Sequence, residues 1–492
     1  MSKTLQVRRG GYVDSVTLMQ VSKTVSASPG VTAALVAMAT ELNLDLATSM
    51  GFDLPASTAP NEMLVAVEAA DDDSLAQALD LVEATLREAA SPAPTAFGAA
   101  PPPVTVGAAA RGSGATVALV STPGEYAFAD AVDAVDAGLH TMVFSDNVPL
   151  EQEVALKRYA EDTDVLVMGP DCGTAVVAGV GLGFANVVRP GPVGIVAASG
   201  TGAQHLMTLL DHAGVGVSHC LGVGGRDLSA DVGGLSTMRA LDLLADDEAT
   251  DLVVVVSKPP DAEVADRLER RAQELGKPVL FALLGPGRPD LTAAAERVVA
   301  AVGGAWQEPS SARGSVETGR PRGYLRGLFA GGTMCYEAML LAAERVGPIA
   351  SNTPLAGGRS LDDQLRSDGH TMIDFGDDRL TRGRPHPMID GSIRVDRLRA
   401  EVEDATTGVV LLDVVLGLGA ALDPAGEIAP AISAATAAGL PVVAAVVGTK
   451  DDPQGLESQV EVLRDAGAWV HGSNADATRT ALSLLRDRED NS

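Results

Sequence analysis

From about residue 115 onward, short apolar runs alternate with segments whose apolar residues recur at helical spacing. Runs rich in Val, Leu, Ile and Ala are typical of strands buried on both faces. The runs with this pattern are 115–121, 141–145, 164–169, 193–199, 217–225, 251–257 and 278–285. Segments 126–138 and 203–214 are expected to be helices. Because strands that alternate with helices form parallel sheets, the pattern predicts an α/β protein.

The C-terminal region, about 323–485, repeats the alternation. Its expected strands are 408–417, 441–448 and 468–473, with helices between them. This arrangement predicts a flavodoxin-like unit.

The N-terminal region has a different pattern. Segments 31–39 and 61–70 resemble strands, and 73–89 is predicted to be a helix because its first turn is acidic and its apolar residues follow helical spacing. Strands that alternate with helices in so short a segment predict a ferredoxin-like or ACT-like α+β domain.

Two segments without periodicity separate these regions. Residues 91–112 are rich in Pro, Ala and Gly, and residues 302–322 are polar and rich in Gly, Ser and Arg. Both are predicted linkers. The linkers therefore delimit three expected regions, 1–90, 113–301 and 323–486.

Composition narrows the functional classes. The chain has 492 residues, about three times the roughly 150 residues of a typical single domain, so we expect three domains. The net charge of −29 predicts repulsion from nucleic acid and from anionic membranes. The three widely spaced cysteines predict neither a zinc site nor a disulfide framework, and we expect no metal. The N-terminus lacks the apolar core of a signal peptide, so a cytoplasmic protein is expected.

Four glycine-rich turns follow predicted strands and open helices, at 198–202, 222–225, 331–333 and 417–419. First-turn amides and the positive end of the helix dipole favour anions. The predicted phosphate-binding residues are Ser199, Gly200, Thr201, Gly202, Gly224, Gly225, Gly331, Gly332 and Thr333. The alternative is that the glycines only make tight turns. Because no turn matches a P-loop or a full dinucleotide fingerprint, the spacing indicates an anion, not a nucleotide.

Several motifs resemble a known superfamily. GPDCG (169–173), GPVGIVAASGTG (191–202) and GVGGRDL (222–228) resemble the α subunit of the NDP-forming acyl-CoA synthetases, the succinyl-CoA synthetase superfamily. GGTMCYEA (331–338) and GRPHPMID (383–390) resemble the end of its β subunit. Together with MVFSDNVPLEQEVALK and VSKPP, these motifs resemble the FdrA family over nearly the whole chain.

The resemblance implies domain identities. It implies a CoA-binding-like Rossmann domain at 113–190, a synthetase α-like ligase domain at 191–301, and a synthetase β C-terminal-like domain at 323–486. It also implies that two helix N-termini face each other: one at Ser199–Gly202, the other at either the 331–333 or the 417–419 turn. The histidine that carries phosphate in the superfamily has no counterpart in the loop 285–298.

The FdrA resemblance implies one subunit of an oxamate carbamoyltransferase-like enzyme of allantoin and purine breakdown. Such an enzyme would transfer a carbamoyl group between an amide or ureido acceptor and phosphate, with carbamoyl phosphate and an oxamate-like acceptor as small anionic ligands. Two further subunits and self-association are implied, and no cofactor is required. One alternative is an acyl-CoA synthetase that binds CoA and a nucleotide, because the superfamily uses both. The other is a non-catalytic scaffold.

Four side chains are candidates for the chemistry. Arg226 could clamp an oxyanion, or could simply pair with Asp227 at the surface. His386 lies between two prolines and could move a proton, or could be structural. Arg384, with its neighbour Arg382, could hold a carboxylate, or could be a solvated charge. Asp171, beside the apolar Cys172, could hydrogen-bond to substrate.

Overall fold

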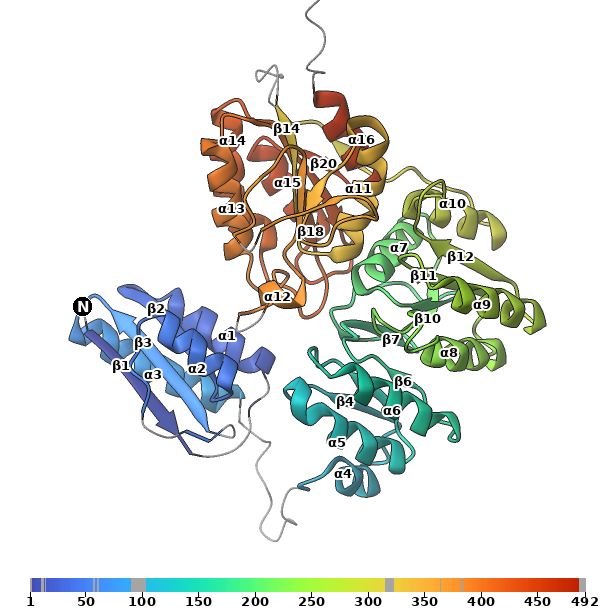
Figure 1. Cartoon of the computed structure of the whole chain (residues 1–492), viewed down its shortest axis with the longest axis horizontal. Coiled ribbons are helices and arrows are strands. Elements are labelled where there is room, and N and C mark those ends of the chain that lie inside the picture. The colour runs from blue at the N-terminus through green and yellow to red at the C-terminus, as the bar shows by residue number, and fades with distance from the viewer. Residues whose placement is uncertain are drawn as a thin grey trace, which may run out of the picture.

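The computed structural model shows a small α+β domain joined to three further α/β units (Figure 1). It describes residues 2–9, 13, 15–55, 58–59, 62–89, 103–314, 323–362, 364–381 and 384–485. The predicted fold class, α/β with a small N-terminal α+β domain, is confirmed.

The N-terminal domain has three antiparallel strands in the order β1 (Ser2–Arg8), β3 (Met63–Ala69), β2 (Val31–Met38). Helices α1 (Ser15–Ser26) and α3 (Asp72–Ala89) pack on the face that carries Val65 and Val67. Helix α2 (Glu41–Ser49) covers the other face, over Ala66. The sequence pattern identified β2, β3 and α3. It missed β1, whose alternating side chains are largely polar.

The next unit is a parallel sheet of three strands in the order β4 (Val117–Val120), β5 (His140–Val143), β6 (Val167–Met168). Its helices are α4 (Val106–Ser113), α5 (Gly124–Asp136) and α6 (Leu150–Glu161). Strand β4 is an edge, and Leu119 on it is 49% exposed.

The six-stranded sheet comes next, in the order β12 (Val279–Leu283), β11 (Leu252–Ser257), β9 (Val193–Ala197), β10 (Val217–Gly222), β7 (Thr174–Val177), β8 (Val180–Gly183). Helices α7 (Gly200–His212), α8 (Leu235–Asp246), α9 (Ala262–Glu274) and α10 (Leu291–Ala301) cover it. Strands β7 and β8, which fall within the predicted domain 113–190, belong to this second sheet.

The last sheet has eight strands, all parallel except the edge strand β13. Their order is β13 (Ser311–Ala312), β20 (Trp469–His471), β19 (Val442–Val447), β18 (Thr407–Val415), β14 (Tyr324–Phe329), β17 (Thr371–Asp374), β15 (Ala350–Ser351), β16 (Arg359–Ser360). Its helices are α11 (Gly332–Val346), α12 (Asp378–Thr381), α13 (Ser392–Glu403), α14 (Pro424–Ala437), α15 (Leu456–Asp465) and α16 (Asn474–Leu484).

Both predicted linkers contain ordered elements. Residues 106–112 belong to α4, because the Thr105 hydroxyl caps the helix by accepting from the Ala108 amide at 3.1 Å and Gly114 ends it in the left-handed region. Residues 311–312 form β13 on the edge of β20. The segments 91–102 and 315–322 lie outside the described residues.

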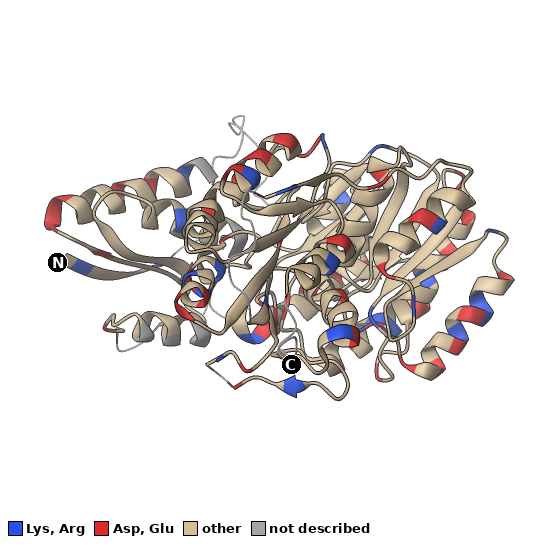
Figure 2. Ribbon diagram, turned by 90° about the horizontal axis from the view of Figure 1, so that it is seen from above, with Lys and Arg blue, Asp and Glu red and all other residues tan. Residues whose placement is uncertain are grey.

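Acidic and basic positions are interspersed along the outer helices, as Figure 2 shows. Within the described ranges, no helix is long and apolar enough to span a membrane. What matters for the site is the arrangement of the domains: the carboxyl ends of β9, β11, β14 and β17 lead into segments that line one shared cavity.

Candidate functional site

Two helices from different sheets begin at the same point. The N-cap of α7 is Ser199, whose Oγ accepts from the Gly202 amide at 3.0 Å. The N-cap of α11 is Gly331. The Ser199 Oγ lies 2.5 Å from the Thr333 Oγ1, so a hydrogen bond joins the first turns of the two helices.

Glycine makes this close approach possible. A Cβ on Gly331 would lie 2.7 Å from the Thr201 side chain, and a Cβ on Gly202 would lie 3.0 Å from the Thr333 methyl group. A helix leaves its first amides without intrahelical partners, and its N-terminus carries partial positive charge. Two such ends meeting in one place therefore favour an anion.

A buried carboxylate fixes the start of α11. Asp413, in β18, accepts from the Ala330 amide at 2.7 Å and from the Gly331 amide at 3.0 Å. Arg394 pairs with the same carboxylate at 3.2 Å. Burial raises the pKa of Asp413, and the Arg394 guanidinium opposes that rise. The turn at the start of α11 is thus held in place by the side chains of Asp413 and Arg394.

The junction opens into a cavity of about 1530 Å³. That exceeds the roughly 300–1,000 Å³ of ordinary ligand pockets. Helix α1 and strand β2 of the N-terminal domain form one wall. Lys23 on α1 ties that wall to the C-terminal unit: its Nζ donates to the Ile389 carbonyl at 2.8 Å and pairs with Glu427.

The 222–225 turn packs against the loop 169–173. A Cβ on Gly222 would lie 2.4 Å from the Thr174 carbonyl oxygen, and Gly224, at φ +88°, approaches the Pro170 carbonyl oxygen equally closely. These glycines therefore allow close packing. Gly224 and Gly225 also line the cavity, whereas Gly202 is not among its lining residues.

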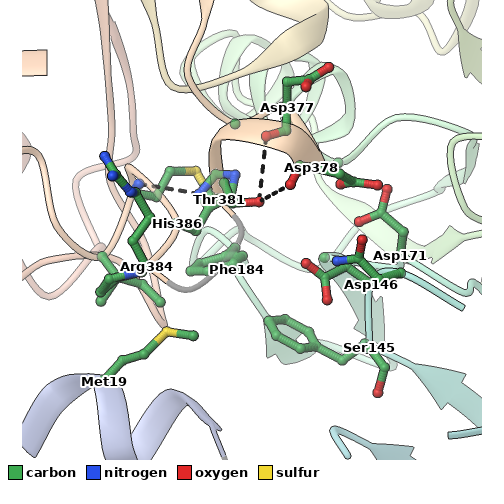
Figure 3. Close-up of a pocket in the computed structure, with 18 of the residues that line it drawn as sticks. Met19, Ser145, Asp146, Asp171, Phe184, Asp377, Asp378, Thr381, Arg384 and His386 are labelled. Atoms are coloured by element: carbon green, nitrogen blue, oxygen red, sulfur yellow. Dashed lines mark hydrogen bonds between the residues drawn. The ribbon is translucent and has the colours of Figure 1, made fainter. Parts of the chain in front are cut away.

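Asp171 extends from this loop into the cavity. Its carboxylate lies near those of Asp146 and Asp378 in Figure 3. Burial within the molecule, followed by the charges of Asp378 and Asp146, raises the pKa of Asp171 to about 7. Among the described residues, no group of carboxylates, histidines or cysteines is arranged to hold a metal ion.

Arg226 is held by partners that do not line the cavity. Its Nε pairs with Glu153 at 2.8 Å and its Nη2 donates to the Val148 carbonyl at 2.9 Å. It does not line the cavity, so the position does not favour an oxyanion clamp. The expected surface pair with Asp227 is also wrong: Asp227 is buried and pairs with Lys157.

His386 and Arg384 line the cavity on the side opposite Asp146 and Asp171 (Figure 3). The Nδ1 of His386 accepts from the Met388 amide at 3.2 Å, and its ring lies 5.5 Å from the Phe184 ring. Burial, followed by Arg394, lowers the pKa of His386 to about 4, so the ring is neutral near pH 7. Arg384 is exposed, and Arg382 lies outside the described residues.

The two candidate turns for the second helix N-terminus are now distinguished. The 331–333 turn faces α7, while Gly417 packs against Ala185, whose carbonyl oxygen would lie 2.6 Å from an added Cβ. The Gly417 amide donates to Gln454 at 3.0 Å. The 417–419 turn therefore serves to join the sheets.

Two residues that line the cavity were not predicted as site residues: Lys258 was not singled out, and Asp374 was expected only to solvate the following loop or to pair with its arginines. Lys258 follows β11, and Asp374 ends β17. A Cβ on Gly332 would lie 2.5 Å from the Asp374 Oδ2 and 3.3 Å from the Lys258 Nζ. Both residues stand at carboxyl ends of parallel strands, and that position was the available signal.

Comparison with known proteins places the chain. A CoA-ligase family model matches residues 328–484, and a model described as AllF, heavy metal-associated domain, matches residues 1–101. The uncharacterised protein YahF of Escherichia coli K12 is 37% identical over 99% of both chains. This chain belongs to the YahF family.

More distant relatives are CoA ligases. Succinate–CoA ligase [ADP-forming] subunit alpha 2 of Archaeoglobus fulgidus is 28% identical over 37% of this chain and 63% of its own length, so the match spans less than two thirds of that relative. A dinucleotide-forming acetyl-coenzyme A synthetase 1 of Ca. Korarchaeum cryptofilum, solved with phosphate and ADP, is 16% identical, with 75% of this chain and 82% of that chain covered and a TM-score of 0.29. The family model and the succinate–CoA ligase relative confirm the predicted resemblance to the succinyl-CoA synthetase superfamily.

These findings overturn two expectations. Carbamoyl transfer as the function is contradicted, because the matching family model and the distant relatives are CoA ligases. The expectation that no cofactor is required is contradicted on the same grounds. The acyl-CoA synthetase alternative agrees better with the comparisons.

The heavy-metal description of the N-terminal model does not fit this chain. Thiolate and imidazole groups are the ligands that soft heavy metals select. Residues 1–101 contain neither cysteine nor histidine. The N-terminal domain of this protein therefore lacks thiolate and imidazole donors for such a metal.

Proposed function

We propose that this protein acts in acid–thiol ligation of the CoA-ligase class, and that the junction of α7 and α11 holds the phosphoryl group of an acyl phosphate. The observation that carries the proposal is the hydrogen bond of 2.5 Å between Ser199 and Thr333, which joins two positive helix ends at the wall of a large cavity. Oriented amides of this kind stabilise charge that develops on a leaving phosphate.

The cavity suits a ligand of the size and charge of CoA. Its lining includes the exposed Arg384, which could pair with a phosphate of CoA, and the cations Lys23 and Arg379, which also pair with Glu427 and Asp377. The turn before α5 lines the same cavity, but Glu125 in the first turn of α5 places a negative charge there and makes this turn less suitable for a phosphate group. We therefore place CoA in the main cavity, with its thiol near the junction.

The reaction assigned to this chain is the transfer of an acyl group from phosphate to a thiol. The bond between the acyl carbon and the phosphate oxygen breaks, and its electron pair stays on phosphate. A bond forms between that carbon and the CoA sulfur, and the thiol proton ends on the released phosphate. Because the loop 285–298 has no histidine, the step uses no phosphohistidine at that place.

We further propose that the chain belongs to the FdrA group within this class and works with additional subunits. The match of residues 1–101 to a model named for AllF supports the grouping. The lack of a P-loop motif in the sequence supports a separate subunit for nucleotide-dependent activation of the acid.

The test combines binding with turnover. Isothermal titration of the full chain with CoA is expected to show saturable binding. Incubation of acetyl, propionyl and succinyl phosphates with CoA is expected to convert free thiol to thioester with at least one of them. Absence of CoA binding would contradict the proposal.

The control separates cavity effects from surface charge. Lys450 is exposed and does not line the cavity, so Lys450→Met is expected to bind CoA as the wild type does. Arg384→Met removes a cavity cation and is expected to weaken CoA binding by about tenfold. Equal binding by both variants would show that CoA does not use this cavity.

A further inference from the structure

Lys258 and Asp374 come from neighbouring sheets and meet at the first residue of α11. Lys258 follows β11 of the six-stranded sheet, and Asp374 ends β17 of the eight-stranded sheet. Both side chains would contact a Cβ placed on Gly332. The absence of a side chain at Gly332 therefore leaves a space between an ammonium and a carboxylate, at a helix N-terminus.

Each of the two groups has unused bonding capacity. The Asp374 Oδ1 accepts from the Gly376 amide at 3.0 Å, but within the described residues nothing hydrogen-bonds its Oδ2, although Asp374 is only 5% exposed. Lys258 makes no ion pair or hydrogen bond with any described residue. Lys258 is half-buried and both residues line the cavity, so both bonding positions are open to a ligand that enters it.

The local charges identify that ligand. An ammonium beside two positive helix ends is repelled unless an anion lies between them. A carboxylate oxygen facing the same space cannot contact an anionic oxygen without a shared proton, since two like charges at hydrogen-bond distance cannot both remain ionised. A phosphoryl group meets both conditions, because it is a dianion that can also carry a proton.

We propose that Lys258 and Asp374 jointly bind the phosphoryl group at the α7–α11 junction, with Lys258 supplying charge and the Asp374 Oδ2 sharing a proton with one phosphate oxygen. This inference rests on the proposed function and assigns roles to two residues within it. During the transfer Asp374 gives this shared proton to the departing phosphate and takes up the proton of the attacking thiol, so that the carboxyl group ends as it began and the protons balance.

The surroundings of Asp374 suit a group that gains and loses a proton near neutrality. Its charged and titratable neighbours are Lys258, Asp377, Asp413, Cys335 and His386. Burial raises the pKa of Asp374 to about 7, against the opposing charge of Lys258, while Asp377 and Asp413 reinforce the rise.

The experiment measures inorganic phosphate binding by isothermal titration at pH 8, in buffers of different ionisation enthalpy. The buffer dependence gives the number of protons taken up with the ligand. The wild type is expected to bind phosphate with uptake that approaches one proton, because Asp374 is mostly ionised before binding and protonated after it. Lys258→Met is expected to weaken phosphate binding tenfold or more.

Asp374→Asn is the decisive variant. It is expected to bind phosphate without the proton uptake that the wild type shows. Asp396→Asn on the exposed side of α13 is the matched control and is expected to retain the uptake. Circular dichroism of each variant confirms folding. If Asp374→Asn does not fold, Asp374→Glu serves in its place and must alter the pH dependence of the uptake.

The outcomes separate this inference from the proposed function. If the wild type binds no phosphate, the phosphoryl cradle itself is wrong. If the wild type binds phosphate and the proton uptake is unchanged in Asp374→Asn, the cradle stands and the role of Asp374 is overturned. If Lys258→Met binds as tightly as the wild type, the role of Lys258 is overturned.

Discussion

Two lysines in this protein occupy opposite situations. Lys157 on α6 is fully buried and pairs with Glu153 and with Asp227, each at 2.8 Å, while its third proton goes to the Val223 carbonyl at 3.0 Å. Lys258 lies in the cavity wall and has no such partner among the described residues. The buried Lys157 is satisfied within the fold, whereas the half-buried Lys258 leaves its charge available to the ligand proposed above.

The largest expected effect is a loss of stability when the buried Lys157 is replaced. Lys157→Met leaves Glu153 and Asp227 buried without their shared cation. Breaking a buried pair costs about 3–5 kcal/mol, so the free energy of unfolding in urea is expected to fall by that amount. Lys450→Met is the exposed control and is expected to change it by less than about 0.5 kcal/mol. A small loss in Lys157→Met would show that the buried network is not structural.

The next effect tests the junction where Lys258 lies. Gly331→Ala places a methyl group 2.7 Å from the Thr201 side chain, so α7 and α11 must move apart. Overpacking of this kind costs about 1–3 kcal/mol, and phosphate binding is expected to weaken as well. Gly276→Ala is the control, because nothing lies within 4 Å of its added Cβ. Equal stability of the two variants in urea would contradict the close contact of the helices.

A pH-dependent difference is expected for Asp374→Asn. Because the pKa of Asp374 is raised in the folded protein to about 7, the wild type loses stability as the pH rises from about 4 through about 7. The asparagine of the variant does not ionise, so the variant does not lose this stability as the pH rises. It is expected to be more stable than the wild type by about 1 kcal/mol or more at pH 8, and equally stable at pH 4. Parallel urea titrations at both values of pH measure the difference, and a pH-independent difference would rule out the shifted titration.

The cap of α7 gives a smaller effect. Ser199→Ala removes both the acceptor for the Gly202 amide and the bond to Thr333. Loss of an N-cap costs about 1 kcal/mol. The midpoint of urea unfolding reports this loss. Ser433→Ala, at an exposed position in α14, is the control that should leave the midpoint unchanged.

The smallest effect completes the comparison of the two lysines. Lys258→Met breaks no ion pair with a described residue, so the free energy of unfolding is expected to stay within about 0.5 kcal/mol of the wild type, measured without phosphate. A loss as large as that of Lys157→Met would remove the distinction between the structural lysine and the ligand-binding lysine.

The sequence predicted the α/β class and the glycine-rich turns because apolar strand runs and strand-end glycines are local patterns. It could not place β7 and β8 in the second sheet, since strand order depends on contacts between distant segments. It favoured Arg226 over Lys258 for a similar reason. Whether a cation faces a cavity or a buried Glu153 depends on how the loop after β10 packs on α6, which no spacing records.

The central claim is that a phosphoryl group lies between α7 and α11. The most direct measurement is a crystal structure of the full chain soaked with arsenate, whose anomalous scattering locates the anion. The account predicts a peak between the amides of Gly200 and Thr201 and those of Gly332 and Thr333, within reach of the Lys258 Nζ and the Asp374 Oδ2. An arsenate peak elsewhere in the cavity, with none at this junction, would contradict it.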